Sequence, residues 1–381
     1  MKKLTVFLLA ALLATACACA AAEMNYELTS PYLVYTQLAV DEEIPVLVDE
    51  MSGAANTVEA GDNAGREEPA EITWPQTFTV TVAGDTTLGS TDDLRKRADC
   101  FERVAEERGY GWFFSGLSEL FGSDDLTLIN FEGTLTEETK KNQKKFNFKG
   151  PAEYTDILTL GSVEAVNIAN NHTKDYGDAG FEDTLANLKA ANLIVSGGGE
   201  LGIFEKNGVK VGMTGYSFPY KDGKKDISAD VKKLREMGCQ IVIASFHWGS
   251  EYRDDFTGEQ RSIGRAALKA GADIVVGHHP HIVQGIEAYQ DSYILYSLGN
   301  LVFGGNVDPD DRDAYAARLT FTVYEDHADA PELTIVPLRL TELSSGTDYR
   351  PVVAQGDEAE RIVSRILKRS SNMDGFENAA L

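Results

Sequence analysis

Five apolar runs follow one another along the chain, and each ends at a cluster of polar residues. The runs are TFTVTV before Gly84-Asp85, LTLI before Asn130-Phe131-Glu132, VEAVNIA before Asn170-Asn171-His172, IVIASF before His247 and DIVV before Gly277-His278-His279-Pro280-His281. Their length and their β-branched residues predict buried strands. Because the ligand crevice of an open α/β sheet lies outside the carboxyl ends of its strands, we expect the polar residues to converge on one site.

Helical patterns separate the later strands. Phe181, Leu185 and Leu188 recur at helical spacing, and two further patterns end at Gly238 and Gly271, which favour a helix stop. The alternation from about residue 163 to residue 276 predicts a largely parallel sheet with helices on both faces. Residues 292–303, 315–324 and 332–341 lack helical patterns between them, so we expect sequential antiparallel strands there.

The N-terminus has the pattern of an export signal. Lys2 and Lys3 precede an apolar run over residues 4–13, which is too short to span a bilayer but has the length of a signal-peptide core. We therefore expect residues 1–22 to be a signal peptide and the protein to be exported. Two outcomes stay open: a lipid anchor at Cys17 on the extracellular face of the membrane, which we favour, or cleavage to a secreted protein.

Composition divides the rest of the chain. Residues 23–74 are rich in acidic and poor in aromatic side chains, which is typical of a disordered spacer. Residues 75–345 are expected to form one α/β domain, because 43% of the 381 residues are hydrophobic. Residues 346–381 are expected to be a C-terminal tail with a short helix around Ile362 and Ile366. The net charge of −25 argues against nucleic acid as a partner, since phosphate binding relies on concentrated lysine and arginine.

The histidines suggest what the predicted site does. Five of the six lie in three of the polar clusters, at His172, at His247 and at His278, His279 and His281. Imidazole and carboxylate groups at strand ends are suitable ligands for a divalent transition metal. The sequence therefore predicts a metal site built from residues far apart in the chain.

Six motifs lie in one order along residues 76–342. They are Gly84-Asp85, Asn130-Phe131-Glu132, ANNHxxDYG from Ala169, FHWGSEY from Phe246, GHHPHIVQGIE from Gly277 and YSLGN from Tyr296. Together they resemble the CapA family, which is named for capsule synthesis, chiefly of poly-γ-glutamate, and is related to the calcineurin-like metallophosphoesterases. The resemblance implies an α/β fold, a four-layer α/β/β/α sandwich of two mixed sheets. It also implies a role in synthesis, transfer or anchoring of an anionic capsule polymer, within a membrane capsule-synthesis complex.

By this resemblance, six side chains hold one or two divalent ions: Asp85, Glu132, Asn171, His247, His279 and His281. Glu132 takes the place of the carboxylate that bridges two ions in the relatives. His172 is then free to protonate a leaving group, with Asp175 orienting its imidazole. The mixed nitrogen and oxygen ligands suit Mn, Fe or Zn, and the expected substrate is a phosphoester or an amide of polyglutamate.

Four positions depart from the expected set of ligands or lie close to it in sequence. The relatives begin with Asp-x-His, whereas Thr87 occupies the histidine position here. We therefore expect the first metal position to bind weakly or not at all. His278 is interpreted as structural, because His279 and His281 fit the family register better. Glu251 and Asn300 are either crevice residues or an ordinary surface charge and turn cap.

A lysine-rich loop follows the Glu132 motif. Lys144, Lys145 and Lys149 could lie on the rim of the crevice and attract an anionic polymer or a phosphate. The alternative is a solvated loop, which we favour slightly. Two functions thus remain open: a metal-dependent hydrolase of the phosphoesterase type, favoured by the retained histidines, and a non-catalytic polymer-binding or assembly subunit, favoured by Thr87.

Overall fold

The computed structural model describes residues 72–218 and 223–378. The expected signal peptide, Cys17 and nearly all of the expected spacer lie outside these residues. Among the residues that are described, no helix is both long enough and apolar enough to cross a membrane.

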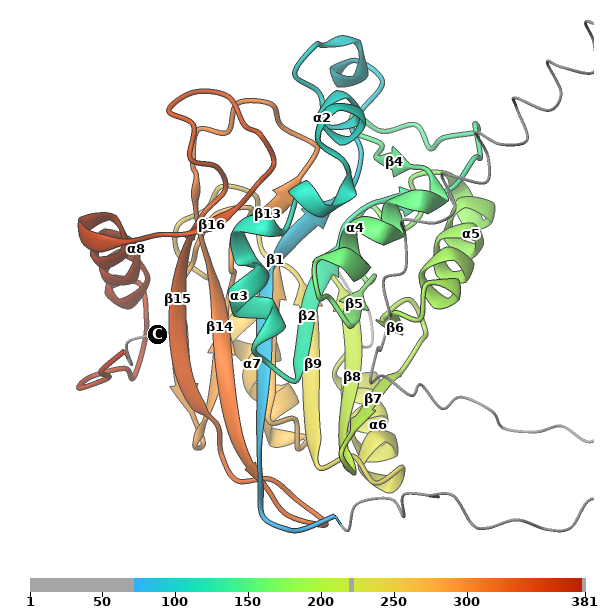
Figure 1. Ribbon diagram of the computed structural model, residues 1–381. Coiled ribbons are helices and arrows are strands. Elements are labelled where there is room, and N and C mark those ends of the chain that lie inside the picture. The colour runs from blue at the N-terminus through green and yellow to red at the C-terminus, as the bar shows by residue number, and fades with distance from the viewer. Residues whose placement is uncertain (1–71, 219–222, 379–381) are drawn as a thin grey trace, which may run out of the picture. The chain divides into compact units, whose positions relative to one another are not determined.

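Two mixed β-sheets form the centre of the folded part (Figure 1). The first sheet has the order β16-β15-β14-β1-β2-β5-β6, with β13 also beside β1. Its strands are β1 (Gln76–Thr87), β2 (Leu126–Phe131), β5 (Ala165–Asn167), β6 (Ile194–Ser196), β13 (Asn300–Phe303), β14 (Asp313–Val323), β15 (Glu332–Arg339) and β16 (Val352–Val353). β1 runs parallel to β2 and β13 and antiparallel to β14.

The second sheet has the order β11-β12-β10-β9-β8-β7. Its strands are β7 (Gly202–Lys206), β8 (Val209–Ser217), β9 (Ile241–His247), β10 (Ile274–His278), β11 (Ile286–Tyr289) and β12 (Ser292–Leu295). A separate two-stranded ladder joins β3 (Thr134–Leu135) to β4 (Lys149–Gly150). The five apolar runs therefore form strands β1, β2, β5, β9 and β10, as predicted.

Three hydrophobic cores separate four layers. Side chains of α2 (Phe101–Arg108), α3 (Ser118–Gly122), α4 (Thr155–Leu160) and α5 (Gly177–Ala190) pack on one face of the first sheet. A second core lies between the two sheets, and a third joins the second sheet to α6 (Gly223–Glu236) and α7 (Gly258–Lys269). This arrangement confirms the expected α/β/β/α sandwich, and Figure 1 shows α3 and α4 in front of the first sheet.

Strand β9 is apolar at consecutive positions because both of its faces are buried. Ile241 and Ile243 belong to the core between the sheets, whereas Val242 and Ala244 pack against the helices behind the second sheet. A strand buried on both faces requires apolar side chains on both.

The C-terminal third differs partly from the expectation. β14 and β15 are sequential antiparallel strands, as expected. Residues 292–303, however, do not form one strand: β12 lies in the second sheet, antiparallel to the preceding β11 and parallel to β10, and β13 pairs in parallel with β1 in the first sheet. Gly299, with φ of 81°, lies in the turn that carries the chain between the sheets.

The segment expected to be a tail packs into the folded part. Its helix α8 (Gly356–Lys368) buries Ile362 and Ile366 in the core between the sheets. Tyr349 is buried in the core beneath α2, where its ring meets Phe101.

Candidate metal centre

The strands bring the polar clusters to one place, as the sequence predicted. Asp85 is in register with Asn130 on β2 and with Asn300 on β13, and His247 is in register with His278. Close approach of two backbones makes this possible, because a Cβ at Gly84 would lie 2.1 Å from the carbonyl oxygen of Gly299. A glycine is therefore required immediately before Asp85.

Glu132 lies at the centre of the cluster without a hydrogen-bond partner. Its side chain is fully buried, and neither carboxylate oxygen is hydrogen-bonded among the described residues. The Nε2 atoms of His247, His172 and His281 lie 3.6, 3.8 and 3.9 Å from Glu132 Oε1. Burial, followed by the charge of Asp85, raises the pKa of Glu132 well above its usual value, although His281 opposes the shift.

Asp85 has a different environment. Although burial opposes its ionisation, the imidazoles of His278 and His281 hold the pKa of Asp85 well below its usual value. Asn130 Nδ2 donates a hydrogen bond of 2.8 Å to Asp85 Oδ1, and the backbone N–H of His279 donates one of 3.2 Å to Oδ2. His278, interpreted as structural, is buried with Nδ1 3.4 Å from Asp85 Oδ1.

The remaining expected ligands surround these carboxylates. His247 Nε2 lies 2.9 Å from Asn171 Oδ1, and the rings of His247 and His279 have centroids 4.6 Å apart. His281 Nδ1 lies 2.9 Å from Asn300 Oδ1. His279 and His281 both have positive φ, 96° and 59°, and such strained backbone is concentrated at functional sites.

The donor atoms fit a metal ion. Ligand atoms of Glu132, His279 and His281 lie within 4.8 Å of one another, as do those of Asp85, Glu132 and His247. A buried carboxylate without a partner is costly unless it is neutralised or coordinates a metal. These residues could therefore hold a divalent cation. Glu132 belongs to both groups, so its carboxylate would be a ligand in either case.

His172 lies beside this cluster in a hydrogen-bonded pair. Its Nδ1 is 2.8 Å from Asp175 Oδ2, which also accepts a 2.6 Å bond from the backbone N–H of Phe148. Burial lowers the pKa of His172, and Asp175 opposes that shift. The free Nε2 therefore faces the cluster while Nδ1 is fixed.

The three candidate lysines have different surroundings. Lys144 pairs with Asp175, donates to the carbonyl oxygen of Asn171 at 2.8 Å and lies 3.1 Å from His172 Nδ1, so it contacts the His172 pair directly. Lys145 lies on the ring of Phe146, 4.6 Å from its centroid. Lys149 donates to the carbonyl oxygen of Glu138 at 2.8 Å.

Thr87 makes a structural contact at the position where the resemblance led us to expect an imidazole. It is buried, and its hydroxyl donates a 2.7 Å hydrogen bond to the carbonyl oxygen of Glu132. It therefore helps to position Glu132 but supplies no nitrogen ligand.

Sequence reasoning assigned no role to a series of buried amides that supports the centre. Asn167 donates to Asn130 Oδ1 at 2.9 Å, and Asn130 donates in turn to Asp85. Asn170 donates to the carbonyl oxygen of Phe131 at 2.7 Å and accepts from the backbone N–H of His172 at 3.0 Å. The available signal was the position of each asparagine at a strand end beside a candidate ligand.

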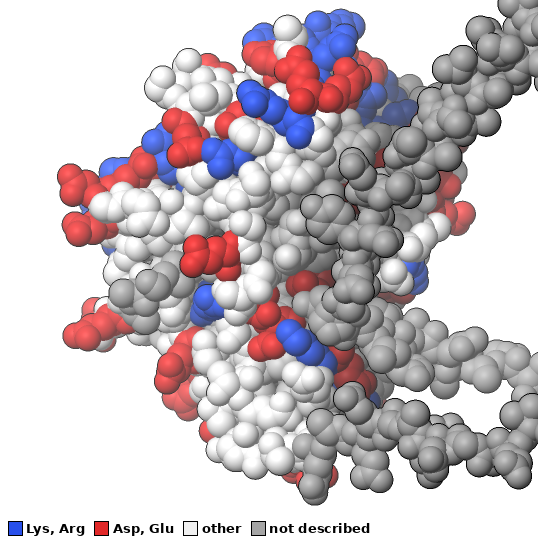
Figure 2. Space-filling view, in the orientation of Figure 1, with Lys and Arg blue, Asp and Glu red and all other residues white. Residues whose placement is uncertain are grey.

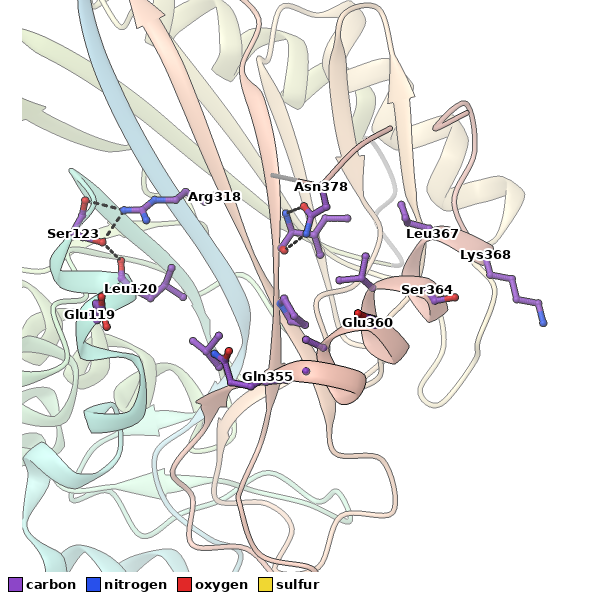
Figure 3. Close-up of a pocket in the computed structure, with 17 residues that line it drawn as sticks. Glu119, Leu120, Ser123, Arg318, Gln355, Glu360, Ser364, Leu367, Lys368 and Asn378 are labelled. Carbon is purple, nitrogen blue, oxygen red and sulfur yellow. Dashed lines mark hydrogen bonds between the residues drawn. The ribbon is translucent and has the colours of Figure 1, made fainter. Parts of the chain in front are cut away.

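Two cavities differ in their relation to the centre. A cavity of about 240 Å³ is lined in part by His172, His281 and Asn300. A larger one, of about 1260 Å³, lies between α3, β15 and α8 (Figure 3). There Arg318 donates to Ser123, and Asn378 bonds to both backbone groups of Ile335. None of the candidate metal ligands lines this larger cavity.

Residues 79–305 match the protein family described as bacterial capsule synthesis protein PGA_cap. The chain belongs to this family. The matched region contains every candidate metal ligand together with His172 and Asp175, and the resemblance to CapA proteins is confirmed.

Two curated relatives come from Bacillus. The chain is 33% identical over 225 residues to the PGA biosynthesis protein CapA of Bacillus subtilis (strain 168), covering 53% of this chain and 59% of that protein. It is 29% identical over 254 residues to the capsule biosynthesis protein CapA of Bacillus anthracis, and this match covers 59% of this chain and 60% of that protein. The chain thus spans about three fifths of the length of these relatives.

Similarity to solved structures is low. A hypothetical protein from Thermus thermophilus has a TM-score of 0.41 and 14% identity, and the match covers 68% of this chain and 99% of that one. A TM-score at this level says nothing about function.

Proposed function

We propose that this protein is an exported member of the PGA_cap family that acts in synthesis, transfer or anchoring of an anionic capsule polymer, through a metal-dependent hydrolase-type site. The observation that carries the proposal is the fully buried carboxylate of Glu132, which has no hydrogen-bond partner among the described residues and has three imidazole Nε2 atoms 3.6 to 3.9 Å away. The family match and the Bacillus relatives support the link to poly-γ-glutamate.

The ligands proposed for divalent ions are Asp85, Glu132, Asn171, His247, His279 and His281. A bound ion would supply a Lewis acid and a water of lowered pKa, as in other metal-dependent hydrolases. The protein's own part is to hold Asp85 ionised and to orient His281 through Asn300, which contacts Nδ1 and leaves Nε2 toward Glu132.

The proposed proton donor is His172. Asp175 fixes Nδ1, so the proton that is transferred leaves from Nε2, the nitrogen that faces the centre. The backbone N–H of Phe148 donates to the same oxygen, Asp175 Oδ2, and Lys144 pairs with the other oxygen, Oδ1. The alternative is a polymer-binding subunit without catalysis, and the replacement of an imidazole by Thr87 favours it.

The first experiment tests the metal centre. Full-length protein purified without chelator is expected to contain at least one transition-metal ion per chain, and His247→Ala should lower that content. His327→Ala is the matched control, because His327 is exposed and stacks on Tyr324 away from the centre. Equal metal content in all three proteins would refute the metal centre.

Catalysis is tested on the same preparations. Hydrolysis of bis-p-nitrophenyl phosphate with Mn²⁺, and shortening of poly-γ-glutamate, should fall by about 10²–10⁴-fold in His172→Ala while metal content is unchanged. If the metal-loaded parent acts on neither substrate, the polymer-binding function replaces the hydrolase.

Export and attachment at Cys17 are part of the proposal. They are supported by the short apolar core and the small residues before the cysteine. Labelling of cells with a fatty acid should mark the parent but not Cys17→Ser, and an unlabelled, released parent would indicate ordinary cleavage instead.

A further inference from the structure

The cavity of about 240 Å³ beside the metal centre has a continuous aromatic wall. Ring centroids are 6.4 Å apart for Phe146 and Phe148, and 5.9 Å apart for Phe148 and Phe303. The row continues with His281 and then Tyr252. The ring centroids of Phe303 and His281 are 5.0 Å apart, and those of His281 and Tyr252 are 6.2 Å apart. Phe146 and Tyr252 are 42% and 65% exposed, so both ends of the wall are open to a ligand.

Two carboxylates on the cavity lining have no ion-pair partner among the described residues. Glu251 and Asp310 are exposed, and neither side chain makes an ion pair or a hydrogen bond within the described part of the chain. Asp311, the third acidic lining residue, is neutralised by Arg365, whose Nη2 lies 2.5 Å from its carboxylate. Two unpaired negative charges beside aromatic rings favour a cation over a neutral or anionic group.

One ring of this wall already contacts an ammonium group of the protein, although that lysine does not line the cavity. Lys145 Nζ lies 4.6 Å from the ring centroid of Phe146, the outermost ring of the row. The inner side of the cavity is formed by His172 and His281, each 7% exposed, whose Nε2 atoms belong to the proposed metal centre. The cavity therefore opens directly beside that centre.

We propose that this cavity is a subsite for a primary ammonium group of the substrate, next to the group that reacts at the metal centre. The inference rests on the proposed function and names its substrate class: an anionic compound that also carries a free amine. A polyglutamate chain has one such group, at its amino terminus. Every γ-linked residue keeps a free α-carboxylate, and only at the amino terminus does an ammonium on the same carbon offset that charge. The unpaired carboxylates of the cavity therefore repel the amino end least, so it is the part that enters.

The test compares two probes on Mn²⁺-loaded full-length protein by isothermal titration calorimetry. They are a γ-linked glutamate pentamer with a free amino terminus and the same pentamer with that terminus acetylated. The free amine is expected to bind about tenfold more tightly, as for a cation on an aromatic wall with carboxylates. The double variant Glu251→Gln, Asp310→Asn should lose this preference. Asp255→Asn is the matched control, because Asp255 is an exposed acid of the same loop that does not line the cavity.

The outcomes separate the subsite from the catalytic function. Equal affinity for the two pentamers, an unchanged preference in the double variant, or equally tight binding of neutral maltotriose would each overturn the subsite. Hydrolysis of bis-p-nitrophenyl phosphate, which has no amine, reports on the metal centre alone. Hydrolysis without amine preference therefore removes only the subsite, and amine preference without hydrolysis removes only the catalytic function.

Discussion

Replacing Glu132 by glutamine should have opposite effects on stability with and without metal. In metal-free protein, Glu132 is a buried carboxylate whose two oxygens lack hydrogen-bond partners among the described residues. An unsatisfied buried polar group costs about 1–3 kcal/mol, and more when it is charged. Burial disfavours the ionised form of Glu132 and raises its pKa, and Glu132→Gln keeps the shape without an ionisable group, so in chelator we expect a gain of about 1–3 kcal/mol.

The same substitution should remove the stabilisation by metal. A ligand at a hundred times its Kd stabilises the folded state by about 2.7 kcal/mol, provided that it binds only that state. The parent should gain this amount on addition of Mn²⁺, whereas Glu132→Gln should gain little, because Glu132 belongs to both potential ligand groups. The two proteins should therefore change their order of stability when metal is added.

The assay is thermal unfolding followed by circular dichroism, in EDTA and in Mn²⁺. A gain of about 1–3 kcal/mol corresponds to a rise in Tm of about 2 to 5 °C for a folded part of this size. Glu287→Gln is the control, because Glu287 is equally buried but accepts bonds from Arg265 and Tyr296. Losing a buried charge pair should destabilise the protein in both buffers. A Glu132→Gln variant that is less stable than the parent in EDTA would refute the argument.

Three further changes test other contacts. Thr87→His should strengthen the weaker metal position by about tenfold or more in calorimetric titration, because it adds a nitrogen ligand while losing one hydrogen bond to Glu132; an unchanged isotherm would contradict this. If Lys144 positions His172 and Asp175, Lys144→Met should lower kcat by about 10²-fold with little change in KM. A raised KM would instead indicate that Lys144 binds substrate. Lys145→Met is the control variant. Burial raises the pKa of Glu164 to about 7, so the folded state binds this proton more tightly than the unfolded state and stability falls as pH rises from about 4.5 to 7. Glu164→Gln should therefore be more stable than the parent by about 2 kcal/mol at pH 8 and nearly equal at pH 4.5 in urea unfolding, and a constant difference across pH would argue against it.

The strands and their layers could be predicted because their apolar residues are continuous in sequence. The run IVIASF before His247 is apolar at successive positions, and β9 is indeed buried on both faces. Residues 292–303 could not be assigned in the same way. Their apolar pattern is that of one strand, and only the pairing partners, β10 and β1, show that the two halves belong to different sheets.

The candidate site was predictable in its residues but not in its contacts. The position of Asp85, Glu132 and His247 at strand ends was enough to expect that they meet. Nothing in the sequence indicates that Lys144 would contact His172, because that contact depends on how the loop before β4 folds over the segment after β5. Charge gives no further guidance, since acidic and basic side chains are interspersed over the face seen in Figure 2.

The two candidate functions make different demands on the amide series behind Asp85. A binding subunit needs only a metal ion or a charged surface, and small shifts of Asp85 would cost it little. A hydrolase needs its ligands held within fractions of an ångström, which is the effect of fixing Asp85 through Asn130 and Asn167 in strand register. Two buried amides are committed to orienting one carboxylate, and binding alone gives no reason for such precision. The arrangement therefore favours the hydrolase, even with Thr87 at the position of the missing imidazole.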